Sequence, residues 1–138
     1  MADLTGLPNL VAGDVIDPIG VAEIHEYEAA AAITKGQAVY LSADDKVSPA
    51  AAAQPCIGIA TKTVAIGEMC PVLVRGRIKV AVGGATTRGE SLYGADASGR
   101  ILAFAGSETA KQYTVRNLGW GEQSATGAGD FIIMNVVK

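Results

Sequence analysis

The strongest β-strand signal in this chain is PVLVRGRIKVAV, at residues 71–82. Its β-branched side chains fall at even-numbered positions, whereas Arg75, Arg77 and Lys79 occupy odd-numbered positions between them. Alternation with a period of two predicts a strand with one buried face and one solvent-facing surface. Gly76, in the middle of the run, predicts a bulge or a bend.

On both sides of this stretch the chain continues as short apolar runs separated by polar or glycine-rich turns. The 17 glycines and the many valines and isoleucines favour strands joined by tight turns over helices. No segment shows sustained helical periodicity, so we expect an all-β protein, a small β-barrel or β-sandwich with little helix. The other predicted strands are residues 21–28, 37–42, 56–64, 91–93, 101–104, 113–120 and 131–137.

The second half of the chain repeats the pattern of the first. The sequence GQAVY at residues 36–40 matches GESLY at residues 89–93, and an Ala-Asp turn follows each. Further along, IGIA and AIGE are matched by LGWG and GAGD, in the same order and at similar spacing. We therefore expect one domain over residues 21–138, built from two related halves at about residues 35–83 and 88–138. Independent convergence on the same turn residues is the alternative.

Residues 1–20 are expected to form an extended N-terminal arm. Glycines and prolines are spaced too closely there for a helix or a long strand. The arm nevertheless carries seven large aliphatic side chains, among them Leu4, Leu7, Leu10 and Val11. Two interpretations account for this composition: an arm folded onto its own domain, and an arm that binds another protein.

Composition and charge exclude several function classes. With 11 Lys and Arg against 14 Asp and Glu, the net charge is −3, so the basic footprint of a nucleic-acid-binding protein is absent. No apolar run approaches the roughly 20 residues that span a membrane, and no secretory signal is visible. Two cysteines are too few for a disulfide scaffold, which favours folding in a reducing cytoplasm.

The sequence contains no recognisable catalytic, cofactor-binding or metal-binding motif. His25 is the sole histidine, so a multi-histidine metal site is impossible. Cys56 and Cys70 lack a Cys-x-x-Cys arrangement and are interpreted as small buried hydrophobic residues. A P-loop, a dinucleotide fingerprint and a nucleophile elbow are also missing. We therefore expect no catalytic residues, no cofactor and no metal, and a protein that is not an enzyme.

Arg75, Arg77 and Lys79 form a short basic stripe on one face of the predicted central strand. A solvated strand face explains such a stripe, and so does a docking surface for an acidic partner. The stripe is too small to form a nucleic-acid groove.

Several segments resemble the small capsid decoration, or cement, proteins of tailed bacteriophages. The resemblance rests on KGQAVY (35–40), CIGIA (56–60), AIGE (65–68), VLVRG (72–76) and RGESLYGADASGRI (88–101). It covers roughly residues 22–137, and its motifs are combinations of turn and strand residues.

This resemblance implies a structural virion protein, made in the cytoplasm of the bacterial host. Such proteins are β-rich and often trimeric, and they clamp capsomers on the outer surface of an expanded capsid against internal DNA pressure. The implied partners are the major capsid protein and further copies of this chain, as a homotrimer, without nucleic acid or membrane. In related proteins an N-terminal arm reaches the capsid lattice. The corresponding contact residues here are Leu4, Leu7, Pro8, Leu10 and Val11.

Three other interpretations stay open. The chain could be a small β-barrel accessory domain that binds a ligand or a peptide, although few aromatic side chains are available to line a pocket. It could be a different virion component, such as a fibre base or a head–tail adaptor, present in few copies. A small hydrolase would have to use His25 with Glu26 or Cys56.

Overall fold

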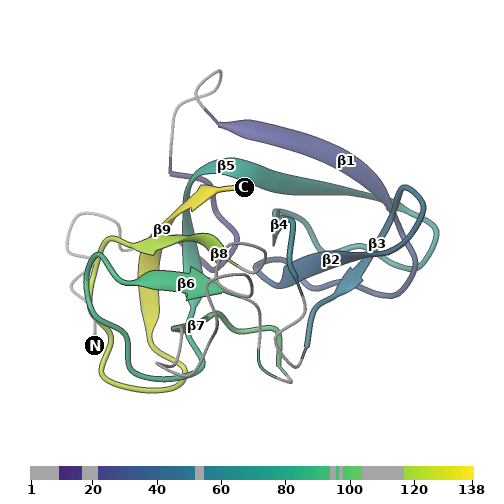
Figure 1. Cartoon of the computed structure of the whole chain (residues 1–138). Coiled ribbons are helices and arrows are strands. Elements are labelled where there is room, and N and C mark those ends of the chain that lie inside the picture. The colour runs from purple at the N-terminus through teal and green to yellow at the C-terminus, as the bar shows by residue number, and fades with distance from the viewer. Residues whose placement is uncertain (1–9, 17–21, 52–54, 94–95, 97, 104–116) are drawn as a thin grey trace.

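The computed structural model describes residues 10–16, 22–51, 55–93, 96, 98–103 and 117–138 (Figure 1). This part of the chain contains nine strands and no helix, so no helix in it could cross a membrane. The expected all-β fold is confirmed. The strands are β1 (Glu23–Ala29), β2 (Ala38–Ala43), β3 (Lys46–Pro49), β4 (Gly58–Ala60), β5 (Met69–Ala81), β6 (Ser91–Tyr93), β7 (Leu102–Ala103), β8 (Asn117–Gly121) and β9 (Phe131–Val137).

One continuous sheet runs in the order β1-β3-β2-β4-β5-β9-β8-β6-β7, and β1 also pairs with β5. That extra pairing closes β1, β3, β2, β4 and β5 into a five-stranded barrel, called here the first barrel. The remaining strands continue from the other half of β5. A bridge between Val82 and Ile101 returns them to the end of β5, and this group is called the second barrel.

The long strand β5 is shared by both barrels, as Figure 1 shows. Val72 and Val74 belong to the core cluster of the first barrel, whereas Ile78 and Val80 belong to the cluster that fills the second. The predicted alternation is confirmed, because these side chains are buried and Arg75 between them is exposed. At Gly76 the backbone adopts φ 130°, a left-handed value, and the strand passes there from one barrel to the other.

The structure shortens one predicted strand. The sequence favoured a strand over residues 56–64, but β4 covers only Gly58–Ala60. After β4 the N–H of Thr61 donates to the carbonyl oxygen of Pro71, and the chain turns toward an isolated bridge at Val64. Of the strand predicted over 113–120, residues 113–116 lie outside the described part of the chain.

Hydrogen bonds of the first barrel recur in the second. The N–H of Ala29 donates to the carbonyl oxygen of Glu68 at 2.8 Å, and 53 residues later the N–H of Val82 donates to that of Asp130 at 2.9 Å. The antiparallel registers of the barrels also correspond, with β1 and β5 in the first matching β5 and β9 in the second. Both barrels thus share one local geometry. That they descend from a duplicated unit stays a prediction.

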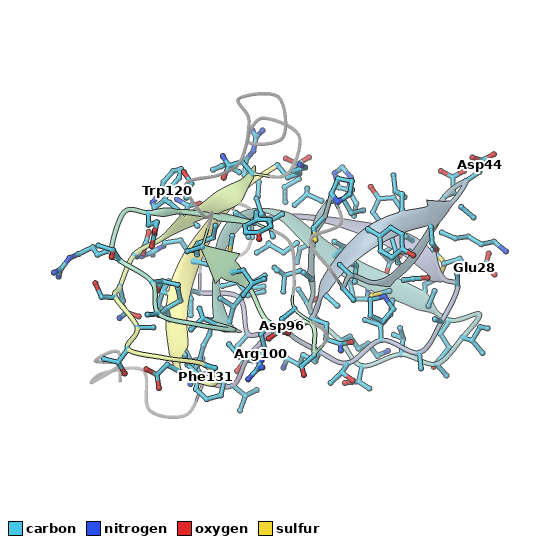
Figure 2. The ribbon with its side chains drawn as sticks, turned by 60° about the horizontal axis from the view of Figure 1, so that its bottom comes forward. Glu28, Asp44, Asp96, Arg100, Trp120 and Phe131 are labelled. Carbon is cyan, nitrogen blue, oxygen red and sulfur yellow. The ribbon has the colours of Figure 1, made fainter. Side chains whose placement is uncertain are left out.

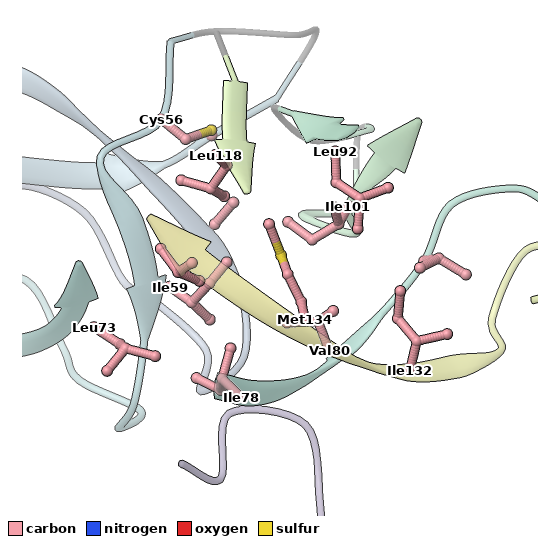
Figure 3. Close-up of a cluster of buried hydrophobic side chains, with 14 of the residues drawn as sticks. Cys56, Ile59, Leu73, Ile78, Val80, Leu92, Ile101, Leu118, Ile132 and Met134 are labelled. Carbon is pink, nitrogen blue, oxygen red and sulfur yellow. The ribbon is translucent and has the colours of Figure 1, made fainter. Parts of the chain in front are cut away.

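The larger buried cluster joins the two barrels (Figure 3). Ile59 and Leu73 come from strands of the first barrel, and they pack in the same cluster as Leu118 and Met134 from the second. All four side chains have no exposed surface. Because this cluster crosses the boundary between the barrels, they form one domain with a shared core.

Two glycines at corresponding places allow neighbouring strands to approach closely. A Cβ at Gly58 would collide with the carbonyl oxygen of Leu73, and a Cβ at Gly119 with that of Asn135. Both obstacles are backbone atoms in paired strands, so they cannot move aside. Gly84, by contrast, has no atom within 4 Å of its Cβ position.

We predict that Gly58→Ala and Gly119→Ala each lower the free energy of unfolding by about 2 kcal/mol, because an added methyl group forces the strands apart. Gly84→Ala is the matched control and should change stability by less than about 1 kcal/mol. Urea unfolding followed by circular dichroism measures all three. Equal stability of the three variants would contradict this account of the strand packing.

Thr86 takes the place in the second barrel that Ile33 takes in the first. Ile33 bridges Val64, and Thr86 bridges Ala125, through the same pair of backbone hydrogen bonds. Thr86 is 5% exposed, and its hydroxyl has no hydrogen-bond partner within the described residues. Burial of a hydroxyl without a partner costs free energy.

We predict that Thr86→Val raises the free energy of unfolding by about 1 kcal/mol, because valine keeps the shape and removes the buried hydroxyl. The reverse change at the corresponding place, Ile33→Thr, should destabilise the protein. Thermal unfolding of both variants tests the pair, and a loss of stability in Thr86→Val would show that the hydroxyl is satisfied.

Candidate functional site

The described residues contain no grouping of side chains suited to holding a metal ion. No cluster of three or more His, Cys, Asp or Glu occurs among them. His25 Nε2 lies 2.8 Å from Glu23 Oε1 on an exposed strand, and both side chains are about half exposed. A hydrolytic site would need a nucleophile within reach of such a base, and the described contacts of the His25 side chain are with Glu23 and the ring of Tyr27.

Both thiols are buried. Burial raises the pKa of the Cys56 thiol to about 12, and burial also raises the pKa of Cys70. A thiol is nucleophilic only as the thiolate, so these pKa shifts oppose reactivity. The positions agree with the interpretation of both cysteines as small hydrophobic core residues.

Part of the predicted arm lies on its own domain. Residues 10–16 run beside the second half of β5, with a bridge between Val15 and Ile78. The N–H of Gly13 donates to the carbonyl oxygen of Lys79 at 2.8 Å, and the N–H of Lys79 donates to that of Asp14 at 3.1 Å. This segment therefore covers the outer edge of β5 as an added strand would.

The candidate arm contacts are only partly placed. Leu10 is half-buried and Val11 is 56% exposed, whereas Leu4, Leu7 and Pro8 lie outside the described residues. Of the two interpretations of the arm, folding onto its own domain describes residues 10–16. Binding of the lattice by the predicted contact residues stays a prediction.

Side-chain charges also hold the arm segment in place. Lys35 Nζ lies 2.5 Å from Asp14 Oδ1, and Asp14 Oδ2 accepts the N–H of Val11 at 2.9 Å. The hydrogen bond from Lys35 lowers the pKa of Asp14 most, followed by the one from Val11. Lys79 Nζ donates to the carbonyl oxygen of Leu10 at 2.6 Å.

The basic stripe has acidic and aromatic neighbours within its own domain. Arg75 lies 4.0 Å from Glu23. Arg77 lies 3.7 Å from Glu122, and Lys79 Nζ sits 4.8 Å from the centroid of the Phe131 ring. The arm segment and these partners occupy much of the stripe, and Arg75, with 63% of its side chain exposed, is the most accessible of the three. A docking role for the stripe stays a prediction.

An acidic end of the first barrel was not anticipated from the sequence. Glu28 and Asp44 lie at the same end of the molecule in Figure 2, far from Trp120 and Phe131 at the other end. An open hollow lies there, lined by Tyr27 and by residues 41–45. Exposed apolar side chains, including Leu41, Ile66 and Met69, accompany the acids. In the sequence, the acidic end was indicated only by the spacing of Glu23, Glu26 and Glu28, and the same spacing occurs on any solvent-exposed strand face.

A second acidic group has a structural role. Asp96 accepts hydrogen bonds from the N–H groups of Ser98 and Arg100 and from the Arg100 side chain at 2.8 Å (Figure 2). Burial would raise the pKa of Asp96, but these hydrogen bonds outweigh burial and hold its pKa below the usual range. The carboxylate is thus used to close the turn between β6 and β7.

We predict that Asp14→Asn lowers the free energy of unfolding at pH 7 by at most about 1 kcal/mol, because the ion pair with Lys35 is partly exposed. The pKa of Asp14 is lowered in the folded state, so its contribution is present above about pH 4 and is lost as the pH falls below that value. Thermal unfolding at pH 7 and at about pH 2 should show the difference at the higher pH only. Asp44→Asn, at an exposed turn, is the control, and an equal deficit at both pH values would contradict the prediction.

The sequence model of the family described as XM1 gp53 minor capsid protein matches residues 4–135. No curated protein matches the chain. A chain in the solved capsid of Myoviridae phage XM1 has a similar fold, with a TM-score of 0.61 and 15% identity, over 94% of this chain and 91% of that one. The N base of the head fibre protein gp8.5 of bacteriophage phi29 is also similar, with a TM-score of 0.56 and 17% identity, over 83% of this chain and 93% of that one.

Proposed function

This chain belongs to the XM1 gp53 minor capsid protein family, and from that premise we propose that it binds the outer surface of the expanded phage capsid and stabilises it against internal DNA pressure. The family makes it a phage capsid-associated structural protein. Position on the outer surface, partnership with the major capsid protein, a homotrimeric state and the absence of catalysis belong to the proposal.

The match of the family over residues 4–135 carries this proposal, because it spans nearly the whole chain. The side-chain chemistry of the described residues also supports the proposal. The described residues hold no metal-ligand cluster, and their thiols are buried, so their chemistry is that of surfaces and strand edges. A formal net charge of −3 argues against nucleic acid as the ligand.

The capsid would be stabilised because binding of this protein is linked to expansion of the lattice. A protein that binds only the expanded lattice shifts the equilibrium toward that lattice by mass action, and the shift grows with the protein's free concentration relative to its dissociation constant. Many copies on one shell act together, and a trimer that bridges neighbouring capsomers adds the effect of multivalency. No single contact then has to be strong.

The capsid contacts we propose are on the arm. Leu4, Leu7 and Pro8 precede the segment that is tied to β5, and Leu10 and Val11 stand at its start. The exposed side chain of Val11 is available for a contact. The pairing of residues 13–16 with β5 would anchor such an arm to the domain, so that tension on the arm is borne by backbone hydrogen bonds.

A head fibre base is a second candidate function. It is favoured by the fold, which the chain shares with the phi29 gp8.5 N base over most of both chains. The two functions differ in copy number, because a fibre base occupies fewer positions on the shell than a protein that covers the whole lattice. Stoichiometry on the capsid therefore distinguishes them.

We predict that the purified protein co-sediments saturably with undecorated, expanded shells of the capsid protein encoded beside it. Near one copy per capsid subunit would support lattice stabilisation, and a few copies per shell would support the fibre base. Decorated shells should also disassemble at a higher temperature or denaturant concentration than undecorated shells. Lack of binding by the folded protein would overturn the proposed function.

Deletion of residues 1–9 tests the arm in the same assay. The cut leaves the pairing of residues 10–16 with β5 intact, so the domain should keep its thermal stability. Loss of shell binding with unchanged unfolding temperature is the expected result. Full binding by the shortened protein would show that Leu4, Leu7 and Pro8 make no essential contact.

A further inference from the structure

Among the described residues, the first barrel has a strand edge that no other strand covers. Over Glu23–Tyr27, β1 pairs with β5 on one side, and its pairing with β3 is confined to Glu28 and Ala29. No described segment pairs with the other side of Glu23–Tyr27, and Figure 1 shows β1 along the margin of the molecule with β5 on its inner side. The first four residues of β1 are exposed, and Ile24 is 45% exposed. Such an edge presents unpaired backbone groups to a partner strand.

The second barrel shows what covers the corresponding edge. Ile24 and Glu26 correspond in register to Arg77 and Lys79, because Ile24 pairs with Leu73 as Arg77 pairs with Asn135. The carbonyl oxygen of Arg77 accepts the N–H of Ile16, and Lys79 exchanges hydrogen bonds with Gly13 and Asp14. The backbone N–H and carbonyl groups of Ile24 and Glu26 therefore face away from β5, and they are positioned to hydrogen-bond to an added strand.

The side chains at the two edges differ in charge. In the second barrel, basic Arg77 and Lys79 are hydrogen-bonded through their backbones to the arm segment, which carries Asp14. In the first barrel, the corresponding residues are apolar Ile24 and acidic Glu26, with Glu23 and Glu28 nearby. Within the described residues Glu26 has no ion-pair partner, whereas Glu23 and Glu28 are paired with Arg75 and Lys46. A complementary strand would carry a basic side chain where the arm carries Asp14.

We propose that the edge of β1 receives an extended, lysine- or arginine-bearing segment of the capsid lattice as an added strand. Backbone hydrogen bonds to Ile24 and Glu26 would hold the segment, and the acidic side chain of Glu26 would select its charge. This inference rests on the proposed function, since it names a second part of this chain, besides the arm, that meets the lattice and the chemistry of the lattice segment that binds there.

Charge argues against a second copy of this chain as the occupant. Two β1 edges paired with each other would place two strands with three glutamates each side by side, and like charges on neighbouring strands destabilise a sheet. The arm segment of another copy would place Asp14 beside Glu26, and residues 10–16 already cover β5 of their own chain. A basic segment from a different protein meets neither obstacle.

Hydrogen exchange on the full-length protein tests the strand directly. Amide exchange is measured over residues 22–28 for the free protein at two concentrations and for the protein bound to undecorated, expanded shells. The amide of Glu26 should exchange at least about tenfold more slowly on the shell, because it gains a strand hydrogen bond. Protection that appears in the free protein as its concentration rises would assign the edge to a second copy and overturn the proposal.

Paired variants test the backbone and the charge separately. Glu26→Pro removes the outward N–H while leaving β1 paired with β5, and Glu26→Ala is its matched control. Glu26→Lys reverses the charge at the edge, and Asp44→Lys makes the same change at an exposed turn that is not part of β1. Glu26→Pro and Glu26→Lys should each weaken shell binding by about tenfold, and Asp44→Lys by no more than about twofold. Thermal unfolding confirms that each variant is folded, and the charge pair decides the result if the proline variant is not.

The outcomes separate this inference from the proposed function. The strand addition would be overturned if the unaltered protein binds shells, its amide exchange over residues 22–28 does not change on binding, and Glu26→Lys binds fully. The proposed capsid function would then still stand. No shell binding by the unaltered protein would overturn both. Weaker binding at raised ionic strength by the unaltered protein, but not by Glu26→Lys, is expected if a basic segment occupies the edge.

Discussion

The hydrogen-bonded ladder along β5 is the constraint on which both barrels depend. Its first half pairs with β1 and β4, and its second half pairs with β9, so one strand forms a wall of each barrel. A slip of one residue in this ladder would turn Val72 and Ile78 outward and the arginines inward. The pairing register of β5 therefore decides which side chains form the two cores.

Barrel closure leaves few strand edges, and the edges that remain identify the surfaces available to partners. The second barrel covers its edge with residues 10–16 of the same chain, held by backbone hydrogen bonds and by the ion pair between Asp14 and Lys35. The first barrel leaves the edge of β1 exposed. A capsid-associated structural protein needs extended contacts more than a deep pocket, and strand edges provide them.

Several features of the site region could be read from local patterns, and others could not. The alternation around Arg75 and Arg77 predicted the exposed face of β5 correctly. The extent of β4 was overestimated: the N–H of Thr61 still donates to Pro71 of β5, but Pro71 has no N–H to donate in return, and the chain then turns toward Val64. The partners of the basic stripe, Glu23, Glu122 and Phe131, are far from it along the chain, so no local pattern revealed them.

By itself, the sequence determined the all-β class, the buried face of the central strand and the repeated turn pattern, because these depend on residues a few positions apart. The resemblance of its motifs to capsid decoration proteins indicated the family. Only the tertiary structure decided that β5 serves two barrels, that residues 10–16 cover one edge and that β1 exposes the other. These features depend on backbone hydrogen bonds between distant parts of the chain. Nearly every residue offers the same backbone N–H and carbonyl groups, so the residue types alone do not show which strands pair.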